Sequence, residues 1–227
     1  MLFKSALIAF LSLGLCAANT VTASGAGPVP SSAEDLSGNR SLTGIVGAIA
    51  DPFGVNLFKI TIVNYLDFSA ITVPVGAFGI PDTELFLFNT SGRGVYGNDD
   101  ISSSNTFSCL PSADSANPCG YGRNGVGPIG NGIYYLAITR SANGPLSNSG
   151  EIFTNLQAGA VAGPDLTAGG ADVLNGWDNG VFTSPDFDLT RYSIELNGIA
   201  PEPATWSLIG AAGLALLLFR RKFVTHQ

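Results

Sequence analysis

The sequence predicts an all-β protein, with a β-sandwich as its central part. Three observations support this prediction. Glycine and proline contribute 29 and 13 of the 227 residues, which favours turns over long helices. Hydrophobic residues make up 45% of the chain, enough to fill a core. About six to nine short segments rich in β-branched and aromatic residues are separated by turn residues, a spacing typical of sandwiches.

The predicted strands differ in how clearly they alternate between apolar and polar residues. The clearest is 55–63, and the segment Asn89–Gly92 is a turn signal that joins two strands into a hairpin. Segment 24–40 is small and polar and is predicted to be a flexible lead-in, while 159–185 is Gly-rich and is predicted to be mostly loop. In chain order, the predicted strands are 41–50, 55–63, 68–73, 83–88, 94–96, 133–139, 151–156 and 191–197.

The N-terminal residues 1–23 have the pattern of a secretory signal peptide. Lys4 supplies the positive charge, and the apolar run Ala6–Leu15 is too short to span ~30 Å of hydrocarbon. Small residues then offer two cleavage positions, after Ala18 and after Ala23. This pattern predicts export through the Sec translocon.

The C-terminal residues 201–227 combine a proline motif, an apolar run and a basic tail. The motif is Pro201, Glu202 and Pro203, and the apolar run is 208–219. We expect a single transmembrane helix there, because cations directly after an apolar run mark the cytoplasmic end of a span. The cations are Arg220, Arg221 and Lys222.

This tripartite C-terminus resembles the PEP-CTERM sorting signal of Gram-negative bacteria that make exopolysaccharide. The resemblance implies that a membrane enzyme, exosortase, recognises Pro201, Glu202 and Pro203 and removes the tail. Two prolines around Glu202 hold an extended segment, which is the backbone form that a processing enzyme can bind. The chain would then be exported, reside transiently in the inner membrane, and reach the cell surface or the extracellular matrix.

The central part resembles bacterial pre-peptidase C-terminal (PPC) domains. The matching stretches are 81–100, which contains Asp-Thr-x-Leu-x-Leu-like and Asn-Asp-Asp motifs, 132–137 and 192–196. The resemblance implies a jelly-roll-like β-sandwich over 41–200 and a binding or stability role without catalysis. The long segment 140–190 departs from the family pattern.

The cysteines and the single histidine limit which catalytic and metal sites the central part can contain. Cys109 and Cys119 are predicted to form a disulfide in the exported chain, because a metal or redox pair would lack other ligands. The single histidine is His226, in the predicted tail. This excludes a Ser-His-Asp triad and His-ligated zinc from the body, although paired carboxylates could still hydrolyse glycosides.

Four residues form a candidate calcium site, since oxygen ligands around a hairpin suit Ca²⁺. The alternative is that they are solvated turn residues. A second candidate surface is an aromatic glycan-binding face, for which burial in a core is the alternative. The candidate ligands are Asp82, Asn98, Asp99 and Asp100; the aromatic residues are Tyr121, Tyr134, Tyr135 and Trp177.

The net charge of −7 argues against a nucleic-acid partner. We therefore expect a non-catalytic, exported structural or binding module that associates with exopolysaccharide. Two alternatives stay open, a calcium-assisted adhesin that binds glycan or matrix and a His-free carboxylate hydrolase. The predicted organisation is 1–23 signal peptide, 24–40 lead-in, 41–200 sandwich and 201–227 sorting signal.

Overall fold

The computed structural model describes residues 19–49, 54–76, 79–80, 82–113, 118–179 and 190–199. All of them belong to one compact unit, Ala18–Pro201. Among these residues no helix has the length and apolar character needed to cross a membrane. The predicted transmembrane segment lies outside the described residues.

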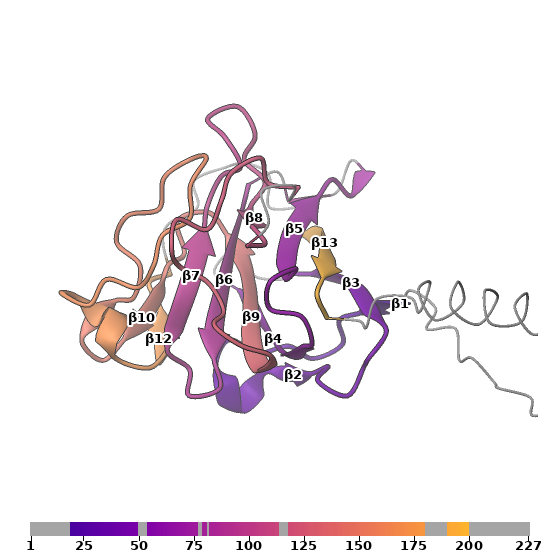
Figure 1. Cartoon of the computed structure of the whole chain (residues 1–227), viewed down its shortest axis with the longest axis horizontal. Coiled ribbons are helices and arrows are strands. Elements are labelled where there is room, and N and C mark those ends of the chain that lie inside the picture. The colour runs from indigo at the N-terminus through magenta and orange to yellow at the C-terminus, as the bar shows by residue number, and fades with distance from the viewer. Residues whose placement is uncertain are drawn as a thin grey trace, which may run out of the picture. The chain divides into compact units, whose positions relative to one another are not determined.

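The described chain folds into three β-sheets, and the all-β sandwich predicted from the sequence is confirmed (Figure 1). The first sheet has the order β1 (Asn19–Thr22), β3 (Leu42–Ala48), β13 (Arg191–Asn197), β5 (Ser69–Val73) and β8 (Cys109–Leu110). The second sheet has the order β2 (Glu34–Asp35), β4 (Val55–Ile62), β9 (Gly132–Arg140), β6 (Thr83–Asn89) and β7 (Gly94–Asn98). A small third sheet contains β11 (Gly150–Glu151), β10 (Pro145–Ser147) and β12 (Gly176–Trp177).

The second sheet is buried on both faces, which explains its nearly continuous apolar strands. Leu85 and Leu87 of β6 face the sandwich core, whereas Phe86 and Phe88 face a second core on the other side. The alternation follows from the two-residue period of a strand. In Figure 1 the second sheet accordingly stands between the first sheet and the small third sheet.

The second core is closed by residues that the sequence analysis placed largely in a loop. Trp177 of β12 packs against Phe86 and Phe88, and its indole N–H donates to the carbonyl of Pro28 over 2.7 Å. Segment 159–185 also contains a 3₁₀ turn, η3 (Gly169–Ala171), and its residues 180–185 lie outside the described part. Of the predicted strand 151–156, only the first residue is in a strand, although Ile152 and Phe153 fill this core.

The segment predicted as a flexible lead-in is part of the fold. It contains a 3₁₀ turn, η1 (Pro30–Ser32), and β2, which pairs in parallel with β4. The backbone N–H groups of Ser24 and Gly25 donate to the carboxylate of Glu34, and Lys59 bonds Asp35 over 2.9 Å. These contacts join residues far apart in sequence, so local composition did not reveal them.

The sandwich begins inside the range predicted as signal peptide. β1 pairs in parallel with β3, and the ladder continues where the N–H of Ala23 donates to the carbonyl of Val46 over 2.8 Å. Val21 packs against the sandwich core. Residues 19–23 therefore lie at the edge of the first sheet, and of the two predicted cleavage positions the one after Ala23 would separate β1 from the sandwich.

Candidate metal centre

Three of the predicted calcium ligands converge at one end of the β6–β7 hairpin. Asp82 directly precedes β6, and Asp99 and Asp100 directly follow β7. Since the two strands are antiparallel, with Leu85 opposite Asn98, the start of one lies beside the end of the other. One carboxylate oxygen of each aspartate lies within 4.8 Å of those of the other two.

These carboxylates are partly buried. Burial, followed by the neighbouring charges of Asp99 and Asp100, raises the pKa of Asp82 to about 6. Burial followed by the charge of Asp100 also raises the pKa of Asp99 to about 6, and burial raises that of Asp100. The Oδ1 atoms of Asp82 and Asp99 are buried without a hydrogen-bond partner. Such oxygens are costly unless a cation or donor meets them.

A fourth carboxyl group, which the sequence analysis did not select, lies beside this cluster. Glu84 of β6 is 4% exposed, and its pKa rises to about 8, first through burial and then through the charge of Asp99. Its Oε1 accepts the N–H of Ala142 over 3.1 Å, but its Oε2 is buried without a partner. The available signal was an acidic residue at a core-facing position within the otherwise apolar run of β6.

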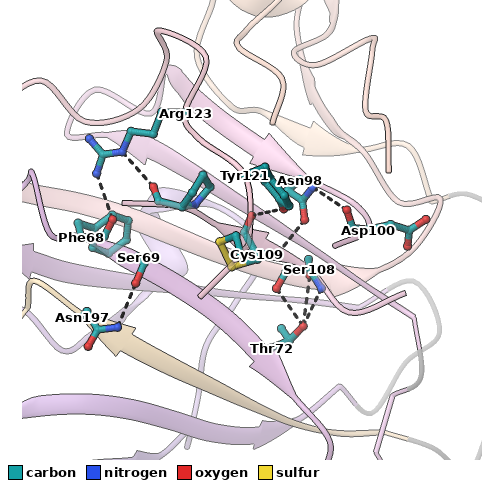
Figure 2. Close-up of a disulfide and its surroundings, with 12 residues drawn as sticks. Phe68, Ser69, Thr72, Asn98, Asp100, Ser108, Cys109, Tyr121, Arg123 and Asn197 are labelled. Atoms are coloured by element: carbon teal, nitrogen blue, oxygen red, sulfur yellow. Dashed lines mark hydrogen bonds between the residues drawn. A yellow bond between two sulfur atoms is a disulfide. The ribbon is translucent and has the colours of Figure 1, made fainter. Parts of the chain in front are cut away.

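Asn98, the fourth predicted ligand, has a different role in the structure. Its side-chain N–H₂ donates to the carbonyls of Asp100 and Ala160 over 3.0 and 2.8 Å, and its Oδ1 accepts the N–H of Cys109 over 2.7 Å. Figure 2 shows this side chain between Asp100 and Cys109. Asn98 therefore fixes the backbone that presents the aspartates.

The predicted disulfide between Cys109 and Cys119 is present, with 5.5 Å between the Cα atoms (Figure 2). It links β8 to the following loop, where the hydroxyl of Tyr121 donates to the carbonyl of Cys109 over 2.8 Å. Because Cys109 also donates to Asn98, the bridge braces the strand beside the acidic cluster.

The aspartate cluster fits a hard divalent cation. All of its potential ligands are oxygen atoms, which Ca²⁺ and Mg²⁺ prefer, whereas zinc and copper favour nitrogen or sulfur. Ca²⁺ accepts irregular arrangements of six to eight oxygens, with water and backbone carbonyls completing the set. Asp82, Asp99 and Asp100 are the residues that would hold the ion.

The four aromatic residues considered as a glycan face do not share a surface. Tyr134 belongs to the sandwich core and Tyr121 packs against it, whereas Trp177 and Tyr135 belong to or border the second core. The second sheet separates the two groups. Trp177 is only 7% exposed, so its ring packs on protein atoms.

The sorting-motif residues Pro201, Glu202 and Pro203 lie outside the described residues, as do Arg220, Arg221 and Lys222. The chain matches no protein-family model, and no curated protein matches it significantly.

Proposed function

We propose that this chain is an exported, non-catalytic β-sandwich module of the bacterial envelope or extracellular matrix, stabilised by Ca²⁺ and associated with exopolysaccharide. The observation that supports it most directly is the convergence of Asp82, Asp99 and Asp100 with buried oxygens that lack partners. The sequence motifs at both termini support delivery by a signal peptide and sorting by exosortase. The jelly-roll-like PPC resemblance belongs to the same proposal.

Calcium would act on the fold by joining two strand ends. Bound Ca²⁺ supplies positive charge where three carboxylates approach, so that Asp82 and Asp99 can ionise without mutual repulsion. The start of β6 would thereby be tied to the end of β7. An exported module meets calcium concentrations at which even weak sites, with Kd of ~10⁻⁴–10⁻³ M, are filled.

Calcium binding is tested by thermal unfolding of the full chain with and without CaCl₂. A site filled at a hundredfold excess over its Kd stabilises the fold by about 2.7 kcal/mol. The Asp99→Asn, Asp100→Asn variant should lose most of this shift in Tm. Asp67→Asn, an aspartate outside the cluster, is the matched control and should keep it. An unchanged Tm of the parent chain in excess calcium would contradict the calcium site.

Export and processing are tested separately by the mass of the cell-surface form. We expect the signal peptide to be cut after Ala18, because cutting after Ala23 would remove β1 from the sheet. N-terminal sequencing should therefore begin at Asn19; a start at Ser24 would contradict this choice. A surface form that still ends at Gln227 would contradict removal of the tail.

A calcium-assisted adhesin is the second candidate. It is favoured by the partial exposure of all three aspartates, which would leave a bound ion open to sugar hydroxyl groups. Exopolysaccharide binding that requires Ca²⁺ and disappears in the Asp99→Asn, Asp100→Asn variant would support it. We do not develop the hydrolase, because no observation on the described residues specifically favours it.

A further inference from the structure

The described sandwich begins and finishes at the same end of the first sheet. β1 pairs with β3 in parallel, with Asn19 opposite Leu42. β13 lies on the other side of β3 in the antiparallel sense, with Glu195 opposite Gly44. If this register is continued to the end of β13, Asn197 lies opposite Leu42, beside the start of β3. We call this the terminal end of the sandwich; the aspartate cluster lies at the opposite end, beside the start of β6.

Two loops cover the terminal end. The carbonyl of Gly198 accepts the N–H groups of Val63 and Asn64, so loop 63–68 lies beside the end of β13. Gly198 has φ +72°, and a Cβ there would come within 2.5 Å of the Asn64 carbonyl oxygen, so only glycine fits this junction. The N–H of Tyr65 donates to Oδ1 of Asn131, which places loop 123–131 beside the first loop.

These loops expose aliphatic side chains to solvent. Ile129 is 93% exposed and Leu66 is 50% exposed, the two largest exposed fractions near this end among the described large hydrophobic residues. Both border a hollow of about 540 Å³ that Tyr65 also lines. Within 62–69 and 118–132 the only charged residues are Asp67 and Arg123. These two loops are therefore poor in charge, in a protein that is acidic overall.

Buried hydrogen bonds hold the conformation of these loops. The guanidinium of Arg123 donates to the carbonyls of Tyr65, Phe68, Pro111 and Pro128, and Figure 2 shows it directed at Phe68. Burial and these bonds fix the loops from within. Leu66 and Ile129 are then left to make contacts outside the molecule.

The sequence beyond the described residues indicates what those contacts are. The apolar run begins at Leu208, nine residues after Ile199, and nine extended residues span about 30 Å at most. If that run enters a bilayer, as the proposed function requires, the terminal end is held within this distance of the lipid surface. Loops with exposed aliphatic residues and little charge are suited to the boundary between headgroups and acyl chains.

We propose that the terminal end is a membrane-contacting surface, in which Leu66 and Ile129 enter the lipid interface while the chain is anchored. The occupant is the bilayer surface itself. The aspartate cluster at the opposite end would then face away from the membrane, towards the matrix. This inference rests on the proposed membrane anchor.

The test uses the full chain in phosphatidylethanolamine–phosphatidylglycerol vesicles that contain a doxyl-labelled quencher lipid. An environment-sensitive fluorophore is attached at Ile129→Cys or, as a second position, Leu66→Cys. The matched control is Ser103→Cys, at an exposed position in the loop that follows Asp100. This loop lies near the aspartate cluster, because the carbonyl of Thr106 accepts the N–H of Thr83 at the start of β6. All variants carry Cys16→Ser, so that the disulfide is the remaining native cysteine pair.

We expect quenching to be several-fold stronger at 129 and 66 than at 103. Equal quenching at the two ends, with the chain still floating with the vesicles, would overturn this inference and leave the anchor standing. A chain that does not float with vesicles would overturn the anchor and, with it, this surface. A blue-shifted but unquenched signal at 129 would identify a second copy or another protein as the occupant and would also overturn the proposal.

Discussion

Both ends of the sandwich bury charged side chains, but these side chains differ in how many of their polar atoms have hydrogen-bond partners. At the terminal end, Arg123 is nearly fully buried and meets four carbonyl groups with its own donors. At the acidic end, Asp82, Asp99 and Glu84 each keep one buried oxygen without a partner. A buried charge with all its hydrogen bonds made serves the fold, whereas unmet acceptors indicate that a further binding partner is expected. The terminal end is thus complete in its polar contacts, and the acidic end is not.

The largest effect is expected from removing the cation that completes the terminal end. Arg123→Met should lower the free energy of unfolding by about 3 kcal/mol or more, because it leaves four carbonyls without their donor. Urea unfolding measures this, with Arg93→Ala, an exposed arginine, as the control expected within about 0.5 kcal/mol of the parent. A loss no larger than that of the control would show that Arg123 does not hold this end together.

The disulfide lies between the two ends. Its removal should cause the next largest loss in the free energy of unfolding. Cys109→Ser, Cys119→Ser should cost about 2–3 kcal/mol, as expected for a bridge that closes a loop of about ten residues. The backbone N–H of Cys109 donates to Asn98, which fixes the backbone of the aspartates. Loss of the bridge loosens this strand, so stabilisation of the fold by calcium should fall as well. Calcium titrations followed by Tm would check this coupling, and an unchanged calcium response would refute it.

The acidic end should respond to pH in a way that the terminal end does not. The pKa of Glu84 rises from 4.5 to about 8 on folding, so the unfolded chain loses this proton first and stability falls as pH rises between those values. Glu84→Gln should remove this penalty and stabilise the calcium-free chain by a few kcal/mol at pH 8, with little effect at pH 4.5. Urea midpoints at both pH values measure the difference; a gain that is the same at both would exclude titration of Glu84 as its cause.

The smallest effect on stability is expected at the exposed part of the terminal end. Ile129→Ser should change the free energy of unfolding by less than about 0.5 kcal/mol, since the side chain is 93% exposed. Its effect should appear only on vesicles, as weaker contact with lipid. A large loss of stability in solution would mean that Ile129 packs within the protein, and the contrast between the two ends would then fail.

Most long strands were predictable because their sequences alternate or are rich in β-branched residues. β13 has the predicted bounds, and β4 and β9 differ from them by one residue at the ends. The short strands β2, β8 and β12 could not be predicted, since two residues carry no periodicity and depend on partners distant in sequence. β1 was hidden because its small residues also suit the end of a signal peptide.

The metal centre was predictable in part for a related reason. A hairpin brings the residues before its first strand next to those after its second, which placed Asp82, Asp99 and Asp100 together. Glu84 was missed although its place in the apolar run of β6 was a signal, because the third layer on that face of the sheet is built by short strands without a sequence pattern. Asn98 was predicted as a ligand, but sequence alone could not show that Cys109 and Ala160 engage its side chain.

The position of β13 has a consequence for the order in which the two sheets can form. β13 stands between β3 and β5, so the first sheet has a gap until the residues up to Asn197 are available. Most of its pairing partners precede it by more than a hundred residues, and such distant pairings form slowly. The first sheet is therefore completed late, whereas the second sheet needs no residue beyond Arg140, so the two layers of the sandwich become available at different times.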